Sequence, residues 1–242
     1  QDWIESGSVS VDGTITSRPS TRLREGAGVG VALPDTAEPR MSPGPEAGSL
    51  SLLYEDEHLL ALNKPPGIVV HPSYKNTSGT LINTVLWHLR DRPAVRPGIV
   101  TRLDKDTSGL LLVSLTPGVH AALQRTRIRK EYLALVIGVP QPASGAIDAP
   151  LGRDPADRRR VVVTPDGIPS LTNYEVLSSA GGISLVRCEL VTGRTHQIRV
   201  HLASRGWPLL GDPAYGVSDV RLARPGLPSW RRAFVHPVSP GP

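Results

Sequence analysis

Short apolar runs of strand length follow one another through most of this chain, and few helical patterns separate them. Helical periodicity stands out at residues 79–91 and, over a shorter stretch, at residues 119–127. Strands without an intervening helix pair in antiparallel or mixed sheets, because a parallel pair needs a long crossover. We therefore predict an α+β fold with a mixed, largely antiparallel sheet and flanking helices. The strand-like runs are residues 51–56, 59–65, 67–72, 109–115, 131–138, 159–165, 172–179 and 183–191.

The first fifty or so residues differ from the rest of the chain. Residues 9–16 alternate apolar and polar side chains around Asp12 and Gly13, a pair that favours the type I′ turn of a β-hairpin because glycine accepts a positive φ. Residues 32–49 contain four prolines and few large apolar groups, so they cannot form a core. We predict a small β-ribbon, a spacer and a larger domain, for which 39% hydrophobic residues can supply the core.

Charge and cysteine content narrow the possible partners and compartment. A net charge of +5 and a pI near 9.7 favour an anionic partner, and we expect nucleic acid rather than a membrane because no basic amphipathic helix stands out. The one cysteine, Cys188, excludes an internal disulfide, and its apolar neighbours predict a packed strand residue. No apolar run approaches the ~20 residues that span a bilayer, and the N-terminus has no signal-peptide pattern. We expect a cytoplasmic protein.

A candidate catalytic carboxylate lies in the segment PGIVTRLDKDTSGLLLV, residues 97–113. Apolar runs flank residues 101–109, which predicts a loop between two strands, where reactive groups are common. Asp104 and Asp106 are two residues apart, so they would share a face in extended backbone. The alternative is a solvated turn whose charges pair locally, which would contribute only about 0–1 kcal/mol.

A second candidate segment runs from residue 191 to residue 216. Thr195 is a plausible N-cap, the following residues favour a helix, and Arg205 with Gly206 forms a stop signal. Arg194 would then lie beside a helix N-terminus, where a carboxylate or a phosphate could bind. The alternative is that Arg194 and Arg199 lie on a solvated face.

The sequence does not suggest a metal or a nucleotide cofactor. His196 and His201 are five residues apart, which separates them by roughly 140° on a helix, whereas helical ligand pairs favour a spacing of four. Neither a dinucleotide-binding nor a Walker sequence is present. We therefore expect a reaction without metal or cofactor. A glycosidase that used Asp104 and Asp106 would need their carboxylates about 5–10 Å apart across a sugar cleft.

Five segments, in order, resemble the motifs of the RluA/RluD-type RNA pseudouridine synthases. They are LALNKPPGIVVHPS, PGIVTRLDKDTSGLLLV, KEYLALVIGVP, GRTHQIRVHLASRGWPLLGDPAYG and the final FVHP. The N-terminal segment is similar to the latter part of an S-four-like RNA-binding domain with an α/β-hairpin fold. The resemblance implies a partial RNA-binding domain at residues 1–34, a linker at 35–49 and a catalytic domain at 50–242.

This resemblance implies an isomerase that converts specific uridines to pseudouridine, in large-subunit ribosomal RNA, without a cofactor. Asp104 would be the essential carboxylate, Tyr132 would offer a flat face and a phenol to the extruded uracil, and Arg194 would pair with Asp104. We expect a monomer that binds structured RNA and no membrane. The expected phosphate contacts are Arg102, Lys105, Arg129, Lys130 and Arg199.

Three features depart from the family pattern. Thr101 replaces the usual histidine before RLD, and Pro228 and Ser229 replace His-Ala near the end, where a proline would remove an N–H from a core strand. The segment between His120 and Tyr132 is shorter than expected, which bears on the placement of the tyrosine. These departures keep open a second hypothesis, a catalytically silent RNA-binding or ribosome-assembly protein with the same fold.

Overall fold

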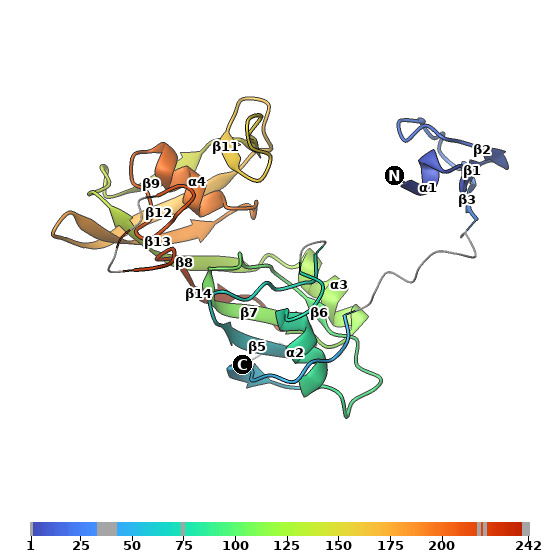
Figure 1. Cartoon of the computed structure of the whole chain (residues 1–242), viewed down its shortest axis with the longest axis horizontal. Helices are drawn as coiled ribbons and strands as arrows, with labels where there is room; N and C mark the ends of the chain where they lie inside the picture. The colour runs from blue at the N-terminus through green and yellow to red at the C-terminus, as the bar shows by residue number, and fades with distance from the viewer. Residues whose placement is uncertain (1, 33–42, 74–75, 217–218, 220–221, 239–242) are drawn as a thin grey trace. The chain divides into compact units, whose positions relative to one another are not determined.

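The chain forms two compact units, residues 1–42 and 43–242, which are described separately (Figure 1). The computed structural model describes residues 2–32, 43–73, 76–216, 219 and 222–238. Most of the expected linker, residues 35–42, therefore lies outside the described residues. None of the helices in the described part of the chain is long and apolar enough to span a membrane.

The N-terminal unit contains the predicted β-hairpin. A short helix, α1 (Asp2–Glu5), precedes β1 (Val9–Val11), β2 (Thr14–Ile15) and β3 (Val29–Val31), and the strands form an antiparallel sheet in the order β2-β1-β3. Asp12 and Gly13 have φ angles of 49° and 80°, as a type I′ turn requires. The hairpin prediction is confirmed, whereas the S-four-like assignment stays a prediction.

The larger unit is built on one mixed sheet with the strand order β4-β5-β7-β14-β8-β13-β12-β9, and β6 also pairs with β7. Among the strand pairs that the structure describes in this sheet, the β14–β7 pair alone is parallel, so the predicted α+β class with a largely antiparallel sheet is confirmed. A separate hairpin joins β10 and β11. The strands are β4 (Leu52–Glu55), β5 (Leu59–Lys64), β6 (Gly98–Ile99), β7 (Ser108–Ser114), β8 (Arg129–Ile137), β9 (Ser144–Asp148), β10 (Leu151–Arg153), β11 (Val161–Val163), β12 (Leu171–Ala180), β13 (Ile183–Leu190) and β14 (Pro228–Ala233).

Three helices pack against this sheet. Figure 1 shows α2 (Leu81–His88) and α3 (Pro117–Arg125) beside the half that contains β5 and β7, and α4 (Gln197–Ser204) beside the half that contains β12 and β13. Both predicted helices, at residues 79–91 and 119–127, are confirmed within a few residues.

The core lies between the helices and the central strands, where alternate side chains point inward. Along β13, every second residue from Ser184 to Cys188 is buried, which is the period of a strand with one face on the core. Cys188 is a packed residue, and burial raises the pKa of its thiol to about 12, so the thiol stays protonated and unreactive.

Two sequence expectations about strands need correction. Residues 67–72 do not form a strand, although Val70 is buried in the core. Pro228 does not disrupt β14, because it is the first residue of that strand, where proline is tolerated, and it lies opposite Ser108 in the parallel pair with β7. At the next pair, Gly109 has a φ of 102°, and a side chain there would lie 2.2 Å from the Ser229 carbonyl oxygen. Glycine is therefore required where β7 meets β14.

Candidate active site

A cavity of about 300 Å³ opens where the loop after β6, strand β8 and the start of α4 meet. The loop comes from residues 100–107, which confirms the prediction that Asp104 lies between two strands. Of the two acidic residues in this loop, Asp104 lines the cavity and Asp106 does not. This difference removes the support for a two-carboxylate glycosidase. The cavity is lined by Val100, Thr101, Arg102, Leu103, Asp104, Thr107, Lys130, Tyr132, Leu190, Gly193, Arg194, Thr195, His196, Gln197, Ile198, Arg199 and Leu227.

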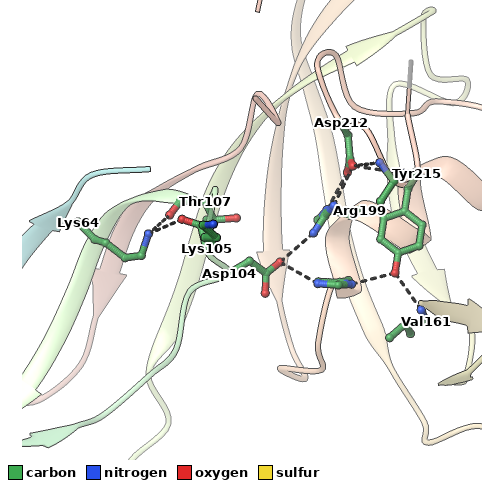
Figure 2. A network of polar contacts seen from close by, with 10 residues as sticks. Lys64, Asp104, Lys105, Thr107, Val161, Arg199, Asp212 and Tyr215 are labelled. Atoms are coloured by element: carbon green, nitrogen blue, oxygen red, sulfur yellow. Dashed lines mark hydrogen bonds and ion pairs between the residues drawn. The ribbon is translucent and has the colours of Figure 1, made fainter. Parts of the chain in front are cut away.

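The arginine that pairs with Asp104 is Arg199, not Arg194. The distance from Arg199 Nη1 to Asp104 Oδ2 is 3.5 Å (Figure 2). Arg194 also lines the cavity, but within the described part of the chain its side chain forms no ion pair with Asp104. The expected Arg194–Asp104 pair is therefore wrong. Arg199 is also not an exposed phosphate contact, because it is only 9% exposed.

The buried carboxylate of Asp212 fixes the orientation of the Arg199 side chain. Arg199 donates from Nε to Asp212 Oδ2 at 2.7 Å and from Nη2 to Oδ1 at 2.8 Å, a bidentate geometry that fixes the plane of the guanidinium. Asp212 is fully buried, and its Oδ1 also accepts the backbone N–H groups of Ala214 and Tyr215. Burial acts to raise the pKa of Asp212, but the Arg199 interaction and the backbone hydrogen bonds outweigh it and lower the pKa.

His196 forms a second link to Asp104. Its Nε2 lies 3.9 Å from Asp104 Oδ2, and its Nδ1 is 2.8 Å from the Tyr215 hydroxyl, which accepts the Val161 N–H at 2.9 Å. His196 rather than Thr195 is the N-cap of α4, with a φ of 57°. Burial lowers the pKa of His196 and the Asp104 carboxylate only partly offsets this, which favours the neutral form of the ring.

Lys64 fixes the loop that carries Asp104. It is fully buried, and its Nζ donates to the Pro65 carbonyl oxygen at 2.8 Å. It also donates to the carbonyl oxygens of Lys105 at 2.8 Å and Thr107 at 2.9 Å (Figure 2). Burial lowers the pKa of Lys64 to about 8, although the nearby carboxylates of Asp106 and Asp104 favour the charged form. The ammonium thus ties the part of the loop that follows Asp104 to the end of β5.

We expect Lys64→Met to destabilise the protein by about 3 kcal/mol, because it removes three hydrogen bonds that a fully buried ammonium donates to carbonyl oxygens. Activity should fall by about 100-fold as the position of Asp104 loosens. Urea unfolding and single-turnover rates would measure both effects. Lys105→Met, which removes an exposed ammonium from the same loop, should change the free energy of unfolding by less than about 0.5 kcal/mol. Equal stability of the two variants would contradict the prediction.

Tyr132 reaches the cavity from β8, so the shortened segment after His120 does not displace it. Its side chain is 6% exposed, and burial raises the pKa of its phenol. Its hydroxyl accepts a hydrogen bond from Arg232 Nη2 at 2.8 Å. Lys130, two residues earlier on the same face of β8, also lines the cavity.

The expected phosphate contacts do not form one cluster. Arg102 and Lys130 line the cavity, but Arg129 does not. Its Nη2 instead pairs with Glu131 at 2.9 Å and with Glu189 at 3.1 Å. Arg194, which was predicted to pair with Asp104, is exposed and lines the cavity. It can contact a phosphate there.

Comparison with known proteins identifies the family of this chain. Residues 58–204, which include Asp104, Tyr132 and Arg199, match the family described as RNA pseudouridylate synthase. The chain belongs to this family. It is therefore a pseudouridine synthase, an isomerase that acts on RNA.

Curated relatives and solved structures agree with this assignment. The synthase is 42% identical over 253 residues to ribosomal large subunit pseudouridine synthase D of Nitrosomonas europaea, covering 99% of this chain and 73% of that protein. It is 38% identical to the protein of the same name from Xanthomonas campestris, covering 100% and 77%. Human RNA pseudouridylate synthase domain containing 1 superposes with a TM-score of 0.61 at 28% identity, covering 81% of this chain and 86% of that one.

Several site residues were missed by sequence reasoning. His196, Asp212 and Tyr215 lie inside the segment singled out at 191–216, but no role was assigned to them. The only local signal is their position near Arg199 in the chain. Lys64 and Arg232 give no such signal, because Thr107, which Lys64 holds, and Tyr132, which Arg232 contacts, are distant from them in sequence.

Proposed function

We propose that this synthase isomerises specific uridines of large-subunit ribosomal RNA, with Asp104 as the essential carboxylate. The observation that carries the proposal is the position of Asp104 in the cavity wall, where it faces Arg199, which Asp212 holds rigidly. A carboxylate that faces a fixed guanidinium is held in one orientation, as either a nucleophile or a base requires. The names of the relatives supply the choice of ribosomal RNA.

The reaction breaks the bond between the ribose and N1 of uracil, turns the base, and forms a bond between the ribose and C5. Asp104 would attack the sugar or remove a proton from it, and C5 finally loses its proton so that the ring regains its double bond. Tyr132 would contact the extruded uracil with its ring. A cavity of about 300 Å³ suits one flipped nucleotide rather than a duplex.

RNA would reach the cavity across the basic side chains at its rim. We propose that Arg102, Lys130 and Arg194 contact phosphates there, with Lys105 at the exposed turn beside them. Residues 1–34 would add a separate RNA-binding unit. A target in ribosomal RNA implies that the protein works in the cytoplasm, and a monomer stays our prediction.

We expect Arg194→Met to weaken RNA binding more than it slows the chemical step. Loss of one phosphate contact should reduce the slope of log affinity against log salt by about 0.7–0.9. Filter binding at several salt concentrations measures this slope. Arg125→Met, which removes an exposed arginine from α3 outside the cavity, is the matched control. A normal slope with a lost chemical step would contradict the phosphate assignment.

Mapping of pseudouridine tests both the activity and the target. Ribosomal RNA is compared between cells that carry only the wild-type protein and cells that carry only Asp104→Asn. Sites lost in the variant and located in large-subunit RNA would support the proposal. Sites lost in another RNA would reject the proposed target. An identical map, together with retained RNA binding, would favour the catalytically silent RNA-binding protein.

A further inference from the structure

Tyr132 has a cationic partner that is not part of the cavity wall. Arg232 on β14 donates from Nη2 to the Tyr132 hydroxyl at 2.8 Å, and its guanidinium carbon lies 4.7 Å from the centre of the tyrosine ring. Arg232 does not line the cavity, whereas Tyr132 does. The arginine therefore contacts the tyrosine from outside the cavity wall.

The register of the sheet produces this contact. Strands β14 and β8 are antiparallel, and Arg232 lies directly opposite Lys130. Tyr132 is two residues further along β8, so it is the diagonal neighbour of Arg232 on the same face, within reach of a long side chain. The contact joins residues 100 positions apart in the chain.

The Arg232 side chain has little else to bind in this position. Its Nε is buried and has no hydrogen-bond partner within the described part of the chain. Its Nη1 makes one hydrogen bond, at 3.3 Å, to the carbonyl oxygen of the adjacent Arg231. The Tyr132 hydroxyl and ring are thus the main partners of a partly desolvated guanidinium, and a cation over an aromatic ring is favourable in such a site.

We propose that Arg232 is a positioning residue that orients Tyr132 in the active site and donates a hydrogen bond to its phenol oxygen. The inference rests on the proposed function, because support for Tyr132 matters to catalysis only if that residue contacts the uracil. Arg232 acts through Tyr132 and does not itself touch the reacting atoms.

The chemical effect follows from the direction of the hydrogen bond. The phenol oxygen accepts an N–H from a cation, so its own proton is free to leave. Burial raises the pKa of Tyr132, and the charge and hydrogen bond of Arg232 act in the opposite direction. Removing Arg232 should therefore raise this pKa further and make the phenolate harder to form.

The first test compares Arg232→Met with Arg231→Met, an exposed neighbour whose loss changes the net charge equally. We expect Arg232→Met to lower the single-turnover rate at saturating enzyme by roughly 10–100-fold, the effect of one hydrogen bond from a charged group. RNA affinity should be unchanged, and Arg231→Met should retain wild-type rates. In a Tyr132→Phe background, Arg232→Met should cause no further loss. Equal rates for Arg232→Met and Arg231→Met, with active wild-type enzyme, would overturn the inference.

The second test measures the ionisation of the Tyr132 phenol directly and does not depend on enzyme activity. Trifluorotyrosine, which titrates below the ordinary tyrosine range, is incorporated only at position 132 of the full chain and followed by ¹⁹F NMR against pH. Arg232→Met should move the midpoint to higher pH, and Arg231→Met should not. If Arg232→Met fails to fold, Arg232→Gln replaces it in both tests, because it also removes the charge. An unchanged midpoint overturns the inference even if the proposed function holds. A shifted midpoint in a protein that forms no pseudouridine would instead reject the proposed function alone.

Discussion

The Asp104→Asn substitution is expected to abolish pseudouridine formation while the fold and RNA binding are retained. Asparagine has nearly the same shape, but it can neither attack the ribose nor accept a proton. We expect the rate to fall by at least about 10³-fold. Stability should change by no more than about 1 kcal/mol, because the carboxylate is 25% exposed and its contact with Arg199 is 3.5 Å long.

Release of tritium from RNA labelled at C5 of uridine measures this loss, because C5 loses its hydrogen in the reaction. Asp106→Asn is the matched control, since it removes the same charge from the same loop but from a residue outside the cavity wall. It should retain most of the activity. The role of Asp104 would be refuted if its variant kept more than a tenth of the wild-type rate, or if Asp106→Asn were equally damaging.

The Arg199→Met substitution is expected to affect both stability and catalysis. It leaves the fully buried Asp212 without its cationic partner, which typically costs about 3–5 kcal/mol. It also removes the guanidinium that faces Asp104, so activity should be lost even where the protein remains folded. Urea unfolding and the tritium assay measure the two effects. Arg194→Met should leave the free energy of unfolding nearly unchanged, because Arg194 is exposed.

A second substitution separates the two effects of Arg199. In Arg199→Met with Asp212→Asn, no unpaired buried charge remains, so more than half of the lost stability should return. Activity should not return, because Asp104 still lacks its partner. If Arg194→Met were less stable and less active than Arg199→Met, the assignment of Arg199 as the partner of Asp104 would be wrong.

The stability difference between wild type and Arg199→Met should depend on pH. The pKa of Asp212 is lowered in the folded protein, so the pair stabilises the fold fully above the unfolded pKa of about 3.9. This contribution is lost as the pH falls through the lower folded pKa. In the Arg199→Met variant burial without the guanidinium raises the pKa of Asp212, so the folded variant takes up a proton first as the pH falls. The difference in free energy of unfolding should therefore be largest at neutral pH and shrink steadily in more acidic solution.

Local features of the fold were predictable from the sequence because their causes are local. Asp12 and Gly13 specify a type I′ turn in any context that allows a hairpin, and Gly206, with a φ of 80°, follows the end of α4 as expected. Residues 67–72 look like a strand for the same local reasons. The neighbours of β5 and β7 in the sheet are other segments, however, and residues 67–72 remain outside it.

Helix α4 shows why the charged residues of the site were harder to assign. Charged side chains usually mark the solvent face of a helix, which is why Arg199 was expected to contact phosphate. In this protein α4 is buried nearly all around, from Gln197 to Leu202, and its polar side chains are paired inside the protein. His201, for example, is hydrogen-bonded to Thr172 Oγ1 at 2.9 Å and to the Ala149 carbonyl oxygen at 3.0 Å.

The sequence by itself determined the fold class, the family and the loop that carries Asp104, because periodicity, turn residues and motif order are local properties of the sequence. Only the tertiary structure decided that Asp104 faces Arg199, that Asp212 orients that arginine, and that Arg232 supports Tyr132. The reason is distance along the chain. Asp104 and Arg199 are 95 residues apart. Whether Arg194 or Arg199 reaches the carboxylate depends on how α4 packs against the sheet and on the left-handed conformation of its N-cap, His196.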